Sequence, residues 1–101
     1  MIEHIVLFKF KPSITLEEKN QLIVRLEALA DQVEGIVQLK VNGDILRTED
    51  SFDLGLFVTL ADRTSLQRYG ESGDRQATSA YARSLCDQIV LFDFEAGNQT
   101  A

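Results

Sequence analysis

The sequence of 101 residues has one cysteine, one histidine, one proline and no tryptophan. A lone cysteine, Cys86, excludes a disulfide within the chain and is typical of the reducing cytosol, so we expect a cytoplasmic location. One cysteine and one histidine also exclude a Cys/His zinc site within a single chain. We expect neither a metal nor another cofactor.

Long apolar runs and basic stretches are missing too. No run approaches the roughly 20 residues that a membrane-spanning helix needs. Ten basic residues stand against 16 acidic ones, and the net charge of -6 argues against binding to nucleic acid or to a membrane. Glu3 and His4 precede an apolar run that ends at Lys9 and Lys11, which is not the layout of a signal peptide. The remaining composition, with 45% hydrophobic residues, is that of one globular domain.

Local patterns predict strands alternating with helices. Apolar and β-branched segments predict four strands, over residues 2–11, 36–46, 52–60 and 88–94, the second of them interrupted at residues 42–44. A capping box at Thr15–Glu18 begins a helix that ends at Gly35. A second helix begins at Asp62, is interrupted at Gly70 and Gly73, and continues over residues 75–86.

The resulting order, β-α-β-β-α-β, predicts an α+β fold of the ferredoxin-like kind. Such a fold has a four-stranded antiparallel sheet with both helices on one face. We expect residues 1–95 to form the domain and residues 96–101 to form a flexible C-terminal tail.

Both faces of the predicted sheet are apolar. Alternate residues of a strand point to opposite faces, and the more continuously apolar side is assigned to the helices: His4, Val6, Phe8, Phe10, Phe52, Leu54, Leu56, Val58, Leu60, Ile89 and Leu91. The other side would present Ile5, Leu7, Phe57, Val90, Phe92 and Phe94. Scattered exposed hydrophobes are normal, but six on one face favour a covering partner. The simplest partner is a second copy, which predicts a homodimer.

Three strand segments, residues 3–11, 52–60 and 89–94, resemble those of the stress-responsive A/B barrel domain (Dabb) family. The resemblance extends over most of the chain. It implies a dimeric α/β barrel, in which two ferredoxin-like sheets close on each other. Members include plant stress-induced proteins and a plant polyketide cyclase, and similar barrels serve cofactor-free monooxygenases and isomerases.

The resemblance to the cyclase also implies a pocket between helices and sheet. Its acid–base tyrosine matches Tyr69, and its strand-one histidine matches His4. Its catalytic histidine, six residues after the tyrosine, is replaced here by Arg75, and a pocket histidine on the third strand is replaced by Leu54. Arginine does not give up its proton near neutral pH, so cyclase-type proton abstraction is not expected. Arg75 could instead bind a carboxylate or phosphate.

Each polar candidate also has a purely structural interpretation. His4 could bind a ligand or move a proton, or it could be a core histidine bonded to a neighbour. Tyr69 could orient a ligand or simply pack at a helix end. Arg75 could form a surface salt bridge to Asp74 or Glu71.

Two further side chains have structural interpretations alone. Cys86 is expected to be a small buried hydrophobe. Asp93 is expected to accept hydrogen bonds from backbone groups at a strand end rather than to act as a catalytic acid.

The favoured hypothesis is a homodimer that binds a small apolar or aromatic molecule between helices and sheet. One alternative is a cofactor-free enzyme, either an oxygenase, an isomerase or a polyketide-cyclase-like protein. Another is a stress-related structural dimer without a ligand. The expected ligand-binding residues are His4, Val6, Phe8, Leu22, Leu26, Leu56, Tyr69, Arg75, Leu85, Ile89 and Leu91.

Overall fold

The computed structural model describes residues 1–97. Its elements are β1 (Ile2–Phe10), α1 (Leu16–Gln32), β2 (Ile36–Gly43), β3 (Leu54–Leu60), α2 (Arg63–Glu71), α3 (Gly73–Leu85) and β4 (Cys86–Glu95). The strands form one antiparallel sheet in the order β2-β3-β1-β4. The predicted ferredoxin-like fold is therefore confirmed, with its second helix divided into α2 and α3. Most of the predicted tail, residues 98–101, lies outside the described residues.

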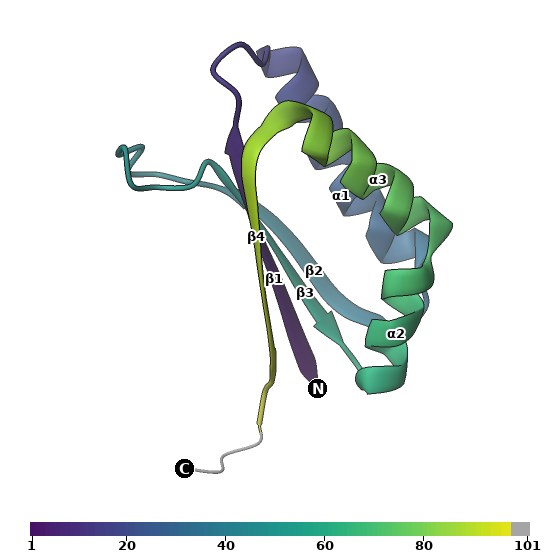
Figure 1. Ribbon diagram of the computed structural model, residues 1–101. Coiled ribbons are helices and arrows are strands. Elements are labelled where there is room, and N and C mark those ends of the chain that lie inside the picture. The colour runs from purple at the N-terminus through teal and green to yellow at the C-terminus, as the bar shows by residue number, and fades with distance from the viewer. Residues whose placement is uncertain (98–101) are drawn as a thin grey trace.

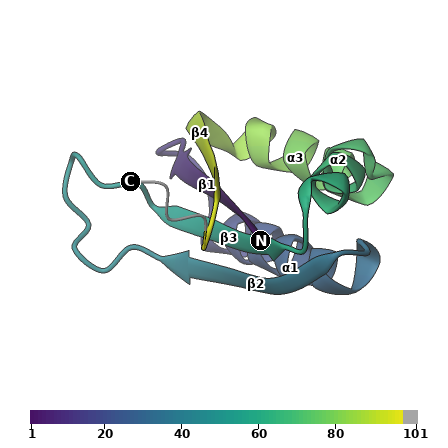
Figure 2. The same ribbon diagram turned by 90° about the horizontal axis from the view of Figure 1, so that it is seen from below.

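All three helices lie on one side of the sheet, and the β2–β3 loop projects from the opposite side (Figure 1). Seen from below, α1 packs beside β2 while α3 leads into β4 at the other edge (Figure 2). The core fills the layer between helices and sheet, where its largest fully buried side chains are Leu22, Leu29, Leu56, Val58 and Leu60. No helix within residues 1–97 is long and apolar enough to cross a membrane.

The predicted N-caps Thr15 and Asp62 both form, whereas α1 ends at Gln32 with Val33 as its C-cap, before the glycine at position 35 that was predicted to end it. The Thr15 hydroxyl accepts a hydrogen bond from the Glu18 backbone N–H at 3.1 Å, and the Glu18 carboxylate accepts one from the Thr15 N–H at 3.0 Å. Ser72 separates α2 from α3, because it is both the C-cap of α2 and the N-cap of α3. Its hydroxyl accepts a hydrogen bond from the Arg75 N–H at 3.2 Å. This cap places Arg75 in the first turn of α3.

Three predicted strand boundaries are wrong by two or three residues. β2 ends at Gly43 rather than at residue 46, because the Asp44 carboxylate accepts a hydrogen bond from the Arg47 N–H at 2.6 Å and closes a turn. β3 begins at Leu54, so Phe52 lies in the loop and not among the helix-facing residues. β4 begins at Cys86, where the cysteine pairs with Phe10 across a register shift.

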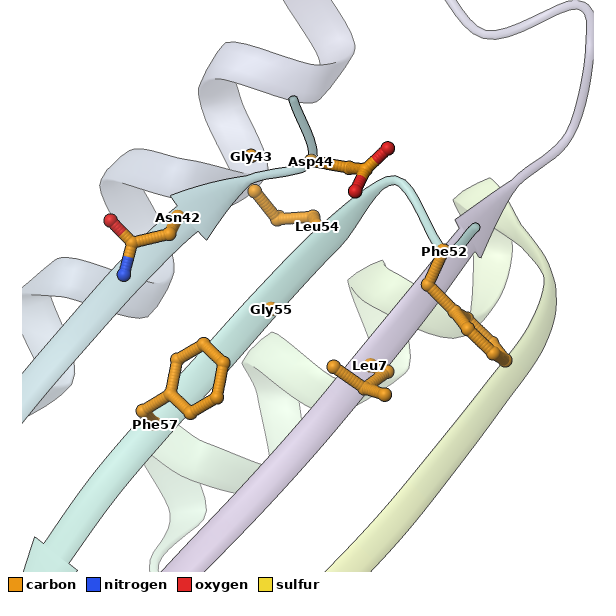
Figure 3. Close-up of a pocket in the computed structure, with 8 residues that line it drawn as sticks. All are labelled: Leu7, Asn42, Gly43, Asp44, Phe52, Leu54, Gly55 and Phe57. Carbon is orange, nitrogen blue, oxygen red and sulfur yellow. The ribbon is translucent and has the colours of Figure 1, made fainter. Parts of the chain in front are cut away.

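The outer face of the sheet, away from the helices, is apolar as predicted. Phe57, Phe92 and Phe94 are 36%, 61% and 41% exposed on a single chain. Phe52 joins this face and lines a small pocket with Leu7, Gly55 and Phe57, among other residues (Figure 3). A Cβ on Gly55 would lie 2.8 Å from the Phe57 ring, so only glycine lets that ring lie across the strand.

Candidate functional site

A cavity of about 490 Å³ lies between the helices and the sheet. Nine of the eleven predicted ligand-binding residues line it: His4, Val6, Phe8, Leu26, Leu56, Tyr69, Arg75, Ile89 and Leu91. Leu22 and Leu85 do not, because both are buried in the adjoining core. Leu91 is 66% exposed and marks the side where the cavity opens to solvent.

Sequence reasoning missed one stripe of the cavity wall. Thr78, Ser79 and Ala82 of α3 line the cavity beside Arg75, the one residue of this stripe that was predicted. Their spacing of three and four residues places them on one face of a helix, which was the available signal. The other lining residues not predicted are Leu29, Leu66, Gly70, Arg83 and Asp93.

The imidazole of His4 is hydrogen-bonded to the carboxylate of Asp93, for which the sequence predicted backbone partners instead. His4 of β1 and Asp93 of β4 are cross-strand partners, and Nδ1 of His4 is hydrogen-bonded to Oδ1 of Asp93. The expectation that Asp93 accepts backbone hydrogen bonds is therefore wrong. An ionised carboxylate can only accept, so Nδ1 donates and Nε2 becomes the basic nitrogen of the neutral ring. Within residues 1–97, Nε2 has no hydrogen-bond partner.

Tyr69 of α2 packs against this histidine. The two ring centroids are 5.1 Å apart, with the rings edge to face at 65°. Tyr69 is 3% exposed, and this burial raises the pKa of its hydroxyl to about 12, against an opposing effect of Arg75 and with a smaller contribution from Asp93. At neutral pH the hydroxyl is therefore protonated and can donate a hydrogen bond. No residue from 1 to 97 accepts one from it.

Arg75 completes the polar part of the cavity. Nη2 donates to the Gly70 carbonyl oxygen at 2.7 Å, and Nη1 donates to the Ser79 hydroxyl at 3.2 Å. The guanidinium carbon lies 5.9 Å from the centre of the Tyr69 ring. Nε is buried without a hydrogen-bond partner in the described part of the chain. The expected salt bridge to Asp74 or Glu71 does not form, because Arg75 lies on the α3 face that lines the cavity.

The cavity wall is positively charged in a protein that is acidic as a whole. Arg75 and Arg83 line it together with one carboxylate, that of Asp93, while the chain has a formal net charge of -6. Cys86 is buried outside the cavity, and burial raises the pKa of its thiol to about 11. Residues 1–97 contain no group of three or more His, Cys, Asp or Glu side chains arranged to hold a metal ion.

The fold and the cavity together define a ferredoxin-like α+β protein with a cavity between its helices and its sheet. The sequence profile of the stress responsive A/B barrel domain (Dabb) family matches residues 2–96. The chain belongs to this family. No curated protein matches the chain in sequence.

Solved structures with the same fold come from bacteria and plants. A dimeric ferredoxin-like protein of unknown function from Thermobifida fusca has a TM-score of 0.83 at 20% identity, covering 92% of this chain and 88% of that one. A Dabb family protein from Mesorhizobium loti has a TM-score of 0.78 at 19% identity, covering 93% and 94%. The hydroxynitrile lyase of Passiflora edulis has a TM-score of 0.84 at 16% identity, covering 92% and 90%. At these identities the likeness shows the fold alone.

Proposed function

We propose that this protein binds a small apolar or aromatic molecule in the cavity between helices and sheet. The observation that carries the proposal is the cavity itself, whose volume of about 490 Å³ lies within the range of small-molecule sites. Its walls are mostly aliphatic and aromatic, and its polar side chains are His4, Tyr69, Arg75, Arg83 and Asp93 together with the hydroxyl groups of Thr78 and Ser79 on α3. A close-packed layer at this place would have excluded a ligand.

Calorimetric titration with 4-butylbenzamide, a neutral aromatic probe, tests the proposal. We expect saturable binding to the wild type and loss of binding in Leu91→Trp, which places a large ring at the cavity opening. Val24→Trp is the matched control, since Val24 is 60% exposed on α1 and does not line the cavity. Equal binding by both variants, or the absence of binding by the wild type of both this amide and its carboxylate analogue 4-butylbenzoate, would reject the proposal and favour a structural dimer without a ligand.

A second candidate function is acid–base catalysis without a cofactor. It is favoured by the Asp93–His4 pair, because an oriented imidazole with a basic Nε2 is a suitable general base. Tyr69 beside it can donate a hydrogen bond to a substrate carbonyl. The lyase from Passiflora edulis supports the idea only in that the same fold can hold an enzyme site.

Proton exchange in heavy water tests the catalytic candidate. The methyl protons of 4-butylacetophenone should exchange for deuterium faster with the wild type than without protein, as followed by proton NMR. His4→Gln should reduce this rate to the background, while Arg25→Gln, outside the cavity, should not. An exchange rate that is unchanged by the wild-type protein would reject this candidate.

We also propose that the chain forms a homodimer through the outer face of the sheet. Three phenylalanines on this face are each more than one-third exposed on a single chain, and the rings of Phe92 and Phe94 lie 5.6 Å apart. An apolar patch of this kind is costly to leave in water. Structural neighbours from Thermobifida fusca and Bacteroides fragilis are described as dimeric. Together the two observations support a second copy of this chain as the covering partner.

A further inference from the structure

We propose that the ligand of the cavity is a singly charged carboxylic acid with an aromatic or alkyl body, and that Arg75 binds its carboxylate. This inference rests on the proposed function that the cavity takes a small molecule. It adds the chemical class of that molecule, and the arrangement of charge and hydrogen-bond donors around Arg75 is what supports it.

The guanidinium of Arg75 has N–H groups without an acceptor, and no anionic partner, among residues 1–97. Of its five N–H groups, one on Nη1 and one on Nη2 are engaged, by the Ser79 hydroxyl and the Gly70 carbonyl oxygen. Both acceptors are neutral, so the positive charge is not paired with any carboxylate of residues 1–97. The Nε–H is buried and lacks an acceptor. A half-buried arginine in this state is suited to an anion that enters the cavity.

Tyr69 supplies a second donor to the same cavity. Its ring lies 5.9 Å from the Arg75 guanidinium carbon, and its hydroxyl has no acceptor among residues 1–97. Because burial raises the pKa of this hydroxyl to about 12, it is a donor and not a competing anion at neutral pH. A carboxylate has two oxygens, so one can accept from Arg75 and the other from Tyr69.

The charge of the wall indicates one negative charge on the ligand rather than two. Arg75 and Arg83 outnumber the single carboxylate, Asp93, by one. A carboxylate brings the wall to neutrality, whereas a phosphate monoester, which is largely doubly charged at neutral pH, leaves one charge uncompensated beside Asp93. The opposite wall, formed by Val6, Phe8 and Leu56 of the sheet, is apolar and suits a hydrocarbon body.

Three probes of one shape test the inference by calorimetry: 4-butylbenzoate, 4-butylbenzamide and 4-butylphenyl phosphate. For the wild type we expect the benzoate to bind about tenfold to a hundredfold more tightly than the amide, as charge-assisted hydrogen bonds do. The phosphate should bind more weakly than the benzoate. Equal affinity for benzoate and amide would overturn the inference and leave the proposed function standing, whereas binding of none of the three would reject both. Tighter binding of the phosphate would overturn the carboxylate class.

Variants of Arg75 test whether this residue causes the preference for benzoate over amide. Arg75→Gln should remove the preference for benzoate over amide, and Arg75→Lys should retain part of it, because lysine keeps the charge without the planar fork. Arg25→Gln is the matched control, since Arg25 also lies over a tyrosine ring, that of Tyr81, but does not line the cavity. A preference that survives in Arg75→Gln would overturn the assignment of this residue. The comparison of the three probes on the wild type does not depend on how well a variant folds.

Discussion

His4 and Asp93 are 89 positions apart in the chain and meet across neighbouring strands, where Nδ1 of the histidine is hydrogen-bonded to Oδ1 of the aspartate. Both lie on the face of the sheet that the helices cover, and both line the same cavity. The pair therefore fixes the orientation of the one histidine in the protein and leaves its other nitrogen for a ligand.

The tautomer of His4 follows from this pair. In the neutral imidazole of the wild type we expect the proton on Nδ1, because only that nitrogen faces a carboxylate. Asp93→Leu should shift the proton toward Nε2, and Asp74→Asn, on the exposed start of α3, should leave it unchanged. Long-range nitrogen–proton NMR reads the result directly, since no other histidine contributes. A wild-type spectrum with the proton on Nε2 would contradict the hydrogen bond.

Burial of Tyr69 should make the protein less stable in strong base. The phenol loses its proton near pH 10.0 in the unfolded chain but near 12 in the folded one, because burial raises its pKa. Between these values the folded state holds more protons, so the free energy of unfolding falls as pH rises from 10 to 12 and is unaffected by this group below 10. Over this pH range, ionisation of Tyr69 lowers the free energy of unfolding by about 2 to 3 kcal/mol.

Urea unfolding of the wild type and of Tyr69→Phe at pH 8 and pH 12 measures this loss. The difference in unfolding free energy between the two proteins should change by about 2 to 3 kcal/mol in favour of the variant at the higher pH. Other groups that titrate in this range, including Cys86, are common to both proteins and cancel in the comparison. Parallel behaviour of the two proteins would show that the phenol is not buried in this way.

Gly35 is required by both its backbone and its surroundings. Its φ is +90°, and an added Cβ would lie 2.5 Å from Oγ of Ser65. We expect Gly35→Ala to lower the unfolding free energy by about 1 to 3 kcal/mol. Gly73→Ala is the control, because an added Cβ there meets nothing within 4 Å at the start of a helix. Thermal unfolding compares the two, and an equal effect at both positions would contradict the close contact.

The outer face should control the oligomeric state. Phe92→Glu places a charge on the apolar face and should convert a dimer into a monomer in light-scattering measurements. Val24→Glu introduces the same charge at a similarly exposed apolar position, 60% against 61%, on the helix side of the molecule. That variant should remain a dimer. A wild-type monomer at micromolar concentration, or a dimeric Phe92→Glu variant, would reject the proposed interface.

Much of the fold could be predicted because its signals are local. The capping box at Thr15–Glu18 and the glycine at position 35 mark helix ends within a few residues of sequence, and alternation along residues 2–10 separates two faces of a strand. The wrong boundary at the end of β2 lies where the Asp44 side chain closes a turn, since such a contact competes with strand pairing.

The candidate site was predictable only in its apolar part and in His4, Tyr69 and Arg75 as separate residues. That Asp93 would bond His4 depended on the register between β1 and β4, which no single segment contains. That Arg75 would line the cavity rather than pair with Asp74 or Glu71 depended on which face of α3 packs over the sheet. The sequence by itself determined the elements and their apolar faces, because those follow from neighbours in the chain. The tertiary structure decided which polar groups share one cavity, because that requires residues far apart in sequence to be brought together by packing.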